Sequence, residues 1–299
     1  MTILYARLAA LAQAGTIPAS LGYPFVVRGI LAVLLLAPLL GGMSHLVVSR
    51  RLAFLSTALG QAALTGLTVG LVLGEPLNAP YGGIFGFCLL CAVVMVYAKR
   101  RATLPADTLI GVFLSLTLGL GICLLVAVTK RFNIHQIEAV MFGSILTVTD
   151  ADLALLAVLG AAVLAVLAWQ YNGLLLDSVS PPLARVGGVP SARLEYLFVV
   201  LLTVAIVASL KIVGALLVEA LVIVPAASGR NLARTMHGYV GWSVLAAATA
   251  GLGGLALSTV FFVPSGAAVV LALSAIFFVT LAAGALTERL GRAGSAERQ

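Results

Sequence analysis

Residues 213–230, VGALLVEALVIVPAASGR, form an apolar run that contains a single acidic side chain. Glu219 lies near its middle, after Leu216 and before Pro225. A charged group at the centre of a membrane helix costs about 2.5–3.5 kcal/mol on insertion scales, so it normally faces the interior of a helix bundle and has a partner. The run therefore predicts a membrane helix whose one acid needs an explanation.

The rest of the chain has the same apolar character. Of its 299 residues, 62% are hydrophobic and only 9% are charged, whereas soluble domains carry about 25% charged residues. We expect an all-α integral membrane protein, one domain over residues 1–299, with eight or nine transmembrane helices. The apolar spans fall at 26–48, 53–73, 81–98, 108–129, 153–171, 195–211, 214–228, 239–258 and 266–285.

The basic residues predict the orientation in the membrane. The net charge is +7, which membrane-edge arginines explain without a nucleic-acid partner. Loops holding 12 of the 17 Lys and Arg residues fall on one side if the C-terminus is cytoplasmic. We therefore expect a multi-pass protein of the cell inner (plasma) membrane, with the N-terminus outside after nine crossings. The opposite side then holds Arg7, Arg28, Lys130, Arg131 and Lys211.

Three segments depart from simple spans. The runs on either side of Lys211 are short and almost contiguous, which predicts a tight helical hairpin or a broken helix. Residues 131–152 are mildly amphipathic and are expected to form an interfacial or re-entrant helix. Residues 172–195 form the longest cytoplasmic loop, and its prolines and glycines bracket a short piece that suits a brief helix at the membrane surface.

Small residues recur every fourth position in the second span, at Ala62, Gly66, Gly70 and Gly74. Such a face lets another helix approach closely, and lining a narrow substrate path is the alternative.

Other polar residues in apolar segments have structural explanations. Cys88 and Cys91 form a CxxC inside a predicted membrane helix, where small packing residues are favoured over a redox or metal pair. Asp107 follows a proline and fits a helix N-cap rather than a metal or coupling role. Asp150 and Asp152 are expected to precede a helix start.

Enzyme signatures are missing from the sequence. It contains no GxxxxGK[ST] phosphate loop, no HExxH, no GxSxG and no His/Cys cluster of zinc spacing. An enzyme is therefore not expected, and a transport path is the natural use of a many-helix bundle.

Six segments, in order, resemble the membrane permease subunit of ATP-binding-cassette (ABC) importers for zinc, manganese or iron, the zinc-uptake permease type. They are VVSRRLAFLSTALGQAALTG (47–66), LPADTLIGVFLSLTLGLG (104–121), MFGSILTVTDADL (141–153), SPPLARVGG (180–188), IVGALLVEALVIVPAASGR (212–230) and VPSGAAVVL (263–271). The resemblance implies a fold of the vitamin-B12-importer type.

The resemblance also implies partners and a substrate. The permease is expected to pair with a second copy of itself, two cytoplasmic ATPase subunits that bind ATP and Mg, an extracytoplasmic solute-binding protein and membrane lipid. A divalent metal is then the substrate, and this chain binds no cofactor of its own.

The same resemblance makes the 180–193 loop the coupling helix that docks into the ATPase. The bracketing prolines and glycines favour this independently, because a coupling element must transmit a push without bending. Arg185 and Arg193 are expected either to pair with acidic groups on a partner or to anchor the loop at the membrane. The predicted coupling residues are Pro181, Pro182, Leu183, Ala184, Arg185, Gly187 and Arg193.

One departure from the family concerns the metal path. After the paired arginines the family usually reads GDALSHA, whose Asp and His are thought to touch the metal, whereas this chain reads STALGQA. Thr57 and Gln61 replace them at the same i, i+4 spacing, on one helix face. Neutral hydroxyl and amide oxygens are poor zinc ligands compared with imidazole and carboxylate.

Glu219 is then the leading candidate for a charged contact with substrate. Three interpretations stay open: a neutral, hydrogen-bonded structural acid, a transient cation ligand in the path with Thr57 and Gln61, or a gating partner of Lys211 or another basic group. The leading hypothesis is a permease for divalent metal import. The alternatives are an importer of a metal chelate (metallophore) or other small solute, an ion-coupled secondary transporter, and a non-transporting membrane scaffold.

Overall fold

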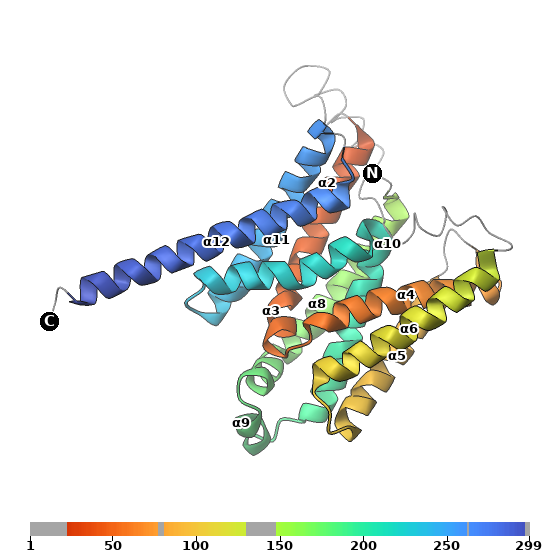
Figure 1. Ribbon diagram of the computed structural model, residues 1–299, viewed down its shortest axis with the longest axis horizontal. Coiled ribbons are helices and arrows are strands. Elements are labelled where there is room, and N and C mark those ends of the chain that lie inside the picture. Colours follow the sequence, from red (N-terminus) through yellow and green to blue (C-terminus); the bar gives the residue numbers. More distant parts are fainter. Residues whose placement is uncertain (1–22, 77–80, 130–147, 262, 297–299) are drawn as a thin grey trace.

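The protein is a bundle of α-helices in the computed structural model, which describes residues 23–76, 81–129, 148–261 and 263–296 (Figure 1). Eight helices in this part are long and apolar enough to cross a membrane, as the composition predicted. The helical elements are α2 (Pro24–Leu36), η2 (Ala37–Gly41), α3 (Gly42–Ser49), α4 (Ala53–Val72), α5 (Tyr81–Arg101), α6 (Ala106–Thr129), α8 (Asp150–Val179), α9 (Pro181–Val186), α10 (Ser191–Leu232), α11 (Met236–Phe261) and α12 (Ser265–Ala296).

Glycines bring α4 and α5 into backbone contact. A Cβ atom added at Gly66 would lie 2.8 Å from the carbonyl oxygen of Gly83, and one added at Gly83 would lie 2.5 Å from that of Gly66. Side chains are therefore excluded from this contact, and the small-residue face predicted from the sequence packs against a neighbouring helix. Gly74 ends the stretch with φ +90°, a conformation that suits glycine in the turn after α4.

Helix α10 reverses direction at Gly214, which has φ 78° and ψ 165° inside an otherwise helical segment. Both ends of α10 lie at the same end of the bundle. Ser191 lines one groove and Arg230 lines a second, and the two grooves share Arg51 and neighbouring residues. The predicted tight hairpin is therefore correct, and Figure 1 shows the change of direction within α10.

We call residues 191–213 the ascending arm and residues 215–232 the descending arm. At 1.5 Å per residue the arms are about 35 Å and about 27 Å long, so each approaches the thickness of a bilayer core. Counting the arms separately gives nine spans in the described residues, the upper value expected from the sequence.

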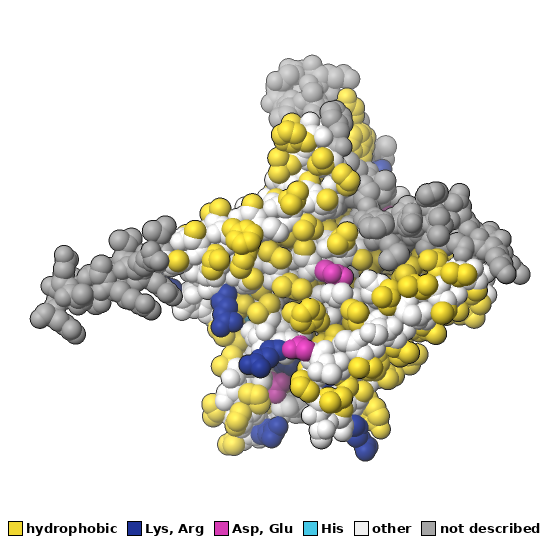
Figure 2. Space-filling view, in the orientation of Figure 1, with side chains coloured by type: hydrophobic (Ala, Val, Ile, Leu, Met, Phe, Trp, Pro, Cys, Tyr) yellow, Lys and Arg dark blue, Asp and Glu magenta, His cyan; other side chains and the backbone are white. Residues whose placement is uncertain are grey.

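The two ends of the bundle differ in charge. Most Lys and Arg side chains on the face shown in Figure 2 gather in the lower half, toward the end that contains α9 in Figure 1. We call this the basic end, and its groove-lining members are Arg50, Arg51, Lys99, Arg100, Arg185, Arg230 and Arg234. The opposite end contains the first residues of α5 and α8 and the turn of α10.

The start of α8 lies where the two acids indicated it, but Asp150 and Asp152 are in its first turn rather than before it. Thr149 is the N-cap residue, its hydroxyl accepts from the backbone N–H of Asp152, and the Asp152 carboxylate accepts from the backbone N–H of Thr149. Asp107 differs from the prediction, because it lies in the first turn of α6 rather than at the N-cap. The Pro105 carbonyl accepts from the Leu109 N–H, so the capping position falls on the proline. The predicted helix at 131–152 lies mostly outside the described residues.

Candidate functional site

The structure brings Thr57 of α4 together with Glu219 of the descending arm. The Thr57 side chain lies close to the Glu219 carboxylate. Gln61 lies one turn further along the same helix face, and all three residues are half-buried. The two helices that the sequence singled out therefore share one polar site, which we call the Glu219 site.

Gly60 of α4 lies between Thr57 and Gln61 in the sequence and close to Glu219. A Cβ atom added at Gly60 would lie 3.4 Å from Glu219 Oε1 and 3.6 Å from the Ala215 Cβ atom, which is ordinary van der Waals contact. The family pattern GDALSHA has aspartate at the position of Thr57. An aspartate there would repel Glu219, whereas the neutral threonine side chain does not. The replacement of that aspartate by Thr57 therefore fits the presence of Glu219.

The Glu219 site offers oxygen atoms from one carboxylate, one hydroxyl and one amide. Oxygen donors suit hard cations such as Mn²⁺ better than Zn²⁺, which prefers imidazole and thiolate. Among the described residues, no three His, Cys, Asp or Glu side chains group closely enough to hold a metal ion.

Lys211 is engaged elsewhere. Its ammonium donates to Asp152 Oδ1 and to the Tyr81 hydroxyl, both at 2.8 Å, and the Tyr81 hydroxyl donates to Asp152 Oδ1 at 3.0 Å. The interpretation of Lys211 as a gating partner of Glu219 is therefore wrong in this structure. Nothing in the sequence singled out Tyr81. Lys211 is one of the few basic residues predicted on the side opposite the cytoplasmic loops, and its charge within an apolar segment indicated that a carboxylate would pair with it.

The predicted coupling segment forms the short helix α9 between rigid ends. Pro181 and Pro182 occupy its first turn, and Gly188 follows it with φ +70°. Ala184 is fully buried, whereas Leu183 is 61% and Val186 is 88% exposed. Arg185, Gly187 and Arg193 are also exposed. The helix thus packs against the rest of the protein through Ala184, and its apolar side chains Leu183 and Val186 are exposed at the basic end.

Two grooves of about 430 and 510 Å³ lie at the basic end, and the first is lined in part by Pro181 and Arg185 of α9. The first contains Arg50, whose guanidinium lies 3.0 Å from the Asp177 carboxylate and donates to the Leu174 carbonyl at 3.0 Å. Desolvation lowers the pKa of Arg50, and the charges of Asp177 and Glu195 oppose that shift. The second groove is lined by Arg51, Arg230 and Arg234, with no acid among its lining residues.

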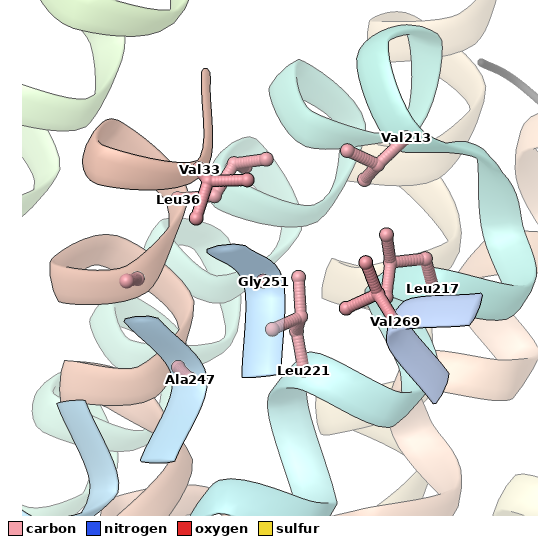
Figure 3. Close-up of a pocket in the computed structure, with 9 residues that line it drawn as sticks. Val33, Leu36, Val213, Leu217, Leu221, Ala247, Gly251 and Val269 are labelled. Atoms are coloured by element: carbon pink, nitrogen blue, oxygen red, sulfur yellow. The ribbon is translucent and has the colours of Figure 1, made fainter. Parts of the chain in front are cut away.

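A cavity beside the turn of α10 is not a candidate path. It has a volume of about 10 Å³ and is enclosed by side chains such as Val33, Val213, Leu217 and Val269 (Figure 3). A space of that size with apolar walls does not hold a stable water molecule, because water needs polar partners. Cys88 is likewise a packing residue, buried with its thiol toward the Leu59 carbonyl at 3.8 Å.

The bundle of membrane-length helices with its hairpin is an architecture of membrane transport proteins. Residues 22–284 match the ABC 3 transport family, and the chain belongs to that family. The expectation drawn from the six sequence segments is thereby confirmed.

Individual relatives extend over nearly the whole chain. It is 31% identical over 259 residues to the high-affinity zinc uptake system membrane protein ZnuB of Haemophilus influenzae, which covers 87% of this chain and 96% of the relative. It is 29% identical over 258 residues to the manganese import system permease protein ScaB of Streptococcus gordonii, covering 86% and 91%.

A solved structure, PsaBC from Streptococcus pneumoniae in complex with Fab, has the same fold. The TM-score is 0.75 and the sequence identity 28%, over 86% of this chain and 91% of that chain. The all-helical permease fold predicted from the sequence is confirmed.

Proposed function

We propose that this chain is the permease subunit of an ABC importer that carries a divalent metal ion across the inner (plasma) membrane into the cell. The observation that carries the proposal is the half-buried carboxylate of Glu219, which lies next to Thr57 and Gly60 of α4. A carboxylate kept within an apolar membrane helix marks a functional site by default. The two relatives named above are a zinc uptake protein and a manganese import permease, which supports a metal as the substrate.

A second copy of the chain is expected to complete the path. One copy offers three side chains with oxygen donors at the Glu219 site, whereas a divalent cation such as Mn²⁺ favours six oxygen ligands. Apolar side chains next to the site are exposed, with Leu216 at 60% and Phe54 at 61%. Two copies related by a twofold axis would cover these side chains and bring two Glu219 carboxylates toward one ion.

The basic end is proposed to face the cytoplasm, with the C-terminus on the same side. Its arginines follow the positive-inside bias. The exposed Leu183 and Val186 of α9 give an apolar centre for docking an ATPase subunit, and Arg185 and Arg193 give it a basic rim. The arginine-lined groove beside α9 extends this surface toward acidic groups of the same partner. ATP and Mg belong to that partner.

The chemistry of the Glu219 site bears on which metal passes. An all-oxygen donor set discriminates little in favour of zinc, because imidazole is missing from it. We therefore expect Mn²⁺ or Fe²⁺ to compete effectively with Zn²⁺ for transport. Extracytoplasmic selection would then rest with the solute-binding protein.

The test is metal uptake by the complete complex in liposomes, with its ATPase and binding protein. We expect Glu219→Gln to lower the rate of Mn²⁺ uptake at least about tenfold, equivalent to ~1.4 kcal/mol, without dissociating the complex. Asp107→Asn, which neutralises an exposed acid in the first turn of α6, serves as the matched control and is expected to transport normally.

Three outcomes would count against the proposal. Uptake by Glu219→Gln at the normal rate would show that the Glu219 carboxylate does not contribute to the metal path. Uptake that requires a chelator and persists in Thr57→Ala with Gln61→Ala would favour a metal chelate as substrate. Transport by this chain alone, without the ATPase, would indicate an ion-coupled secondary transporter.

A further inference from the structure

The turn of the α10 hairpin is fixed by a compact polar cluster at the end opposite the basic end. Lys211, three residues before Gly214, contacts α8 through Asp152 and α5 through Tyr81. The ammonium also lies 4.8 Å from the centre of the Tyr81 ring, within the range of a cation–π contact. Three helices thus meet at one cation, and we call these residues the turn cluster.

Every member of the turn cluster is held by a second interaction. Asp152 uses Oδ1 for Lys211 and Tyr81 and Oδ2 for the α8 capping box with Thr149. The Asp152 side chain is only 10% exposed and that of Lys211 is 33% exposed. Glu75 accepts from the backbone N–H of Gly83 at 3.1 Å, which fixes the first turn of α5 next to Tyr81. The anchor is therefore rigid on the α5 and α8 sides.

The descending arm begins at this anchor and carries Glu219 five residues beyond Gly214. At 1.5 Å per residue, Glu219 lies about 7.5 Å along the arm from the turn. Glycine permits the sharp reversal but does not fix its direction, because it has the fewest steric restrictions on its backbone dihedrals. The direction of the descending arm is set by its own buried side chains, such as Leu217 and Val222, together with whatever holds the residues before Gly214.

We propose that Lys211, Asp152 and Tyr81 are positioning residues for transport: they fix the turn of α10 so that the descending arm presents Glu219 to Thr57 and Gly60 of α4. The proposal rests on the proposed function of Glu219. The positive charge of Lys211 is kept out of the metal path because Asp152 neutralises it. The cluster thereby serves the cation site without touching the cation.

A double-mutant cycle on Mn²⁺ uptake by the complete complex tests this role. We expect Lys211→Met to lower uptake about tenfold in the wild-type background and less than about twofold in the Glu219→Gln background, because coupled residues give non-additive effects. Lys211→Arg, which keeps the charge, is expected to restore part of the activity. Tyr81→Phe removes one hydroxyl only and gives a milder variant if Lys211→Met does not assemble.

The matched control is Arg28→Met, which breaks the ion pair of Arg28 with Asp150, at 2.7 Å, at the same end of the bundle. That pair does not involve α10, so its effect should multiply with that of Glu219→Gln. If the effects of Lys211→Met and Glu219→Gln also multiply, the turn cluster only stabilises the fold and the positioning role is refuted. If Glu219→Gln alone transports normally, the proposed function itself fails.

Discussion

Replacing Gly83 by alanine tests the close approach of α4 and α5. A Cβ atom at Gly83 would lie 2.5 Å from the Gly66 carbonyl oxygen, 2.5 Å from Gly70 Cα and 2.6 Å from Gly70 N. All three are backbone atoms, so no side chain can rotate away. Since ordinary contact begins at 3.4 Å, the helices must separate by up to about 1 Å. Such overpacking costs about 1–3 kcal/mol.

The assay is thermal unfolding of the purified protein in detergent. We expect Gly83→Ala to lower the melting temperature by several degrees, in line with a loss of about 1–3 kcal/mol. Gly86→Ala is the matched control, because a Cβ atom there meets nothing within 4 Å and alanine is the better helix former. A Gly83→Ala protein as stable as the Gly86→Ala protein would refute the backbone contact.

Three further changes probe the hairpin, the basic end and α9. Gly214→Ala places a side chain at φ 78°, ψ 165°, a region almost restricted to glycine, and should cost about 1–3 kcal/mol in thermal unfolding. Asp177→Asn leaves the Arg50 charge, whose side chain is 8% exposed, without its ion-pair partner; a loss on the order of 3 kcal/mol is expected, and unchanged stability would contradict it. Leu183→Asp alters a side chain that is 61% exposed, so stability should hold within about 0.5 kcal/mol while binding of the ATPase, measured by co-purification, weakens.

The helical membrane fold was predictable because the apolar spans are long and the charges few. The hairpin at Gly214 was predictable as one of two possibilities, since the two arms are short and nearly contiguous in sequence. The contact between Thr57 and Glu219 was harder to predict from the sequence, because it depends on how α4 packs against α10. The family pattern identified Thr57, and the unusual charge identified Glu219, but no local signal joined them.

The turn cluster shows where sequence reasoning stops. Asp152 was predicted just before a helix start and lies in the first turn of α8, yet its second role toward Lys211 depends on a residue 59 positions away. Tyr81 begins α5 with an ordinary aromatic side chain, and only the packing of α5 beside α8 and α10 gives its hydroxyl two charged neighbours. Long-range polar contacts of this kind leave no period or spacing in the sequence.

The Gly214 turn also has a consequence for membrane insertion. Its two arms are joined by a single residue, so neither can be inserted long before the other. With the basic end in the cytoplasm, as proposed above, they enter the bilayer as a pair with Lys211 near the leading tip. Carrying that charge through hydrocarbon is unfavourable on its own. Asp152 and Tyr81 precede Lys211 in the chain and are synthesised first, so the groups that pair with the lysine are available when it is inserted. The order of residues along the chain thus matches the order in which the hairpin needs them.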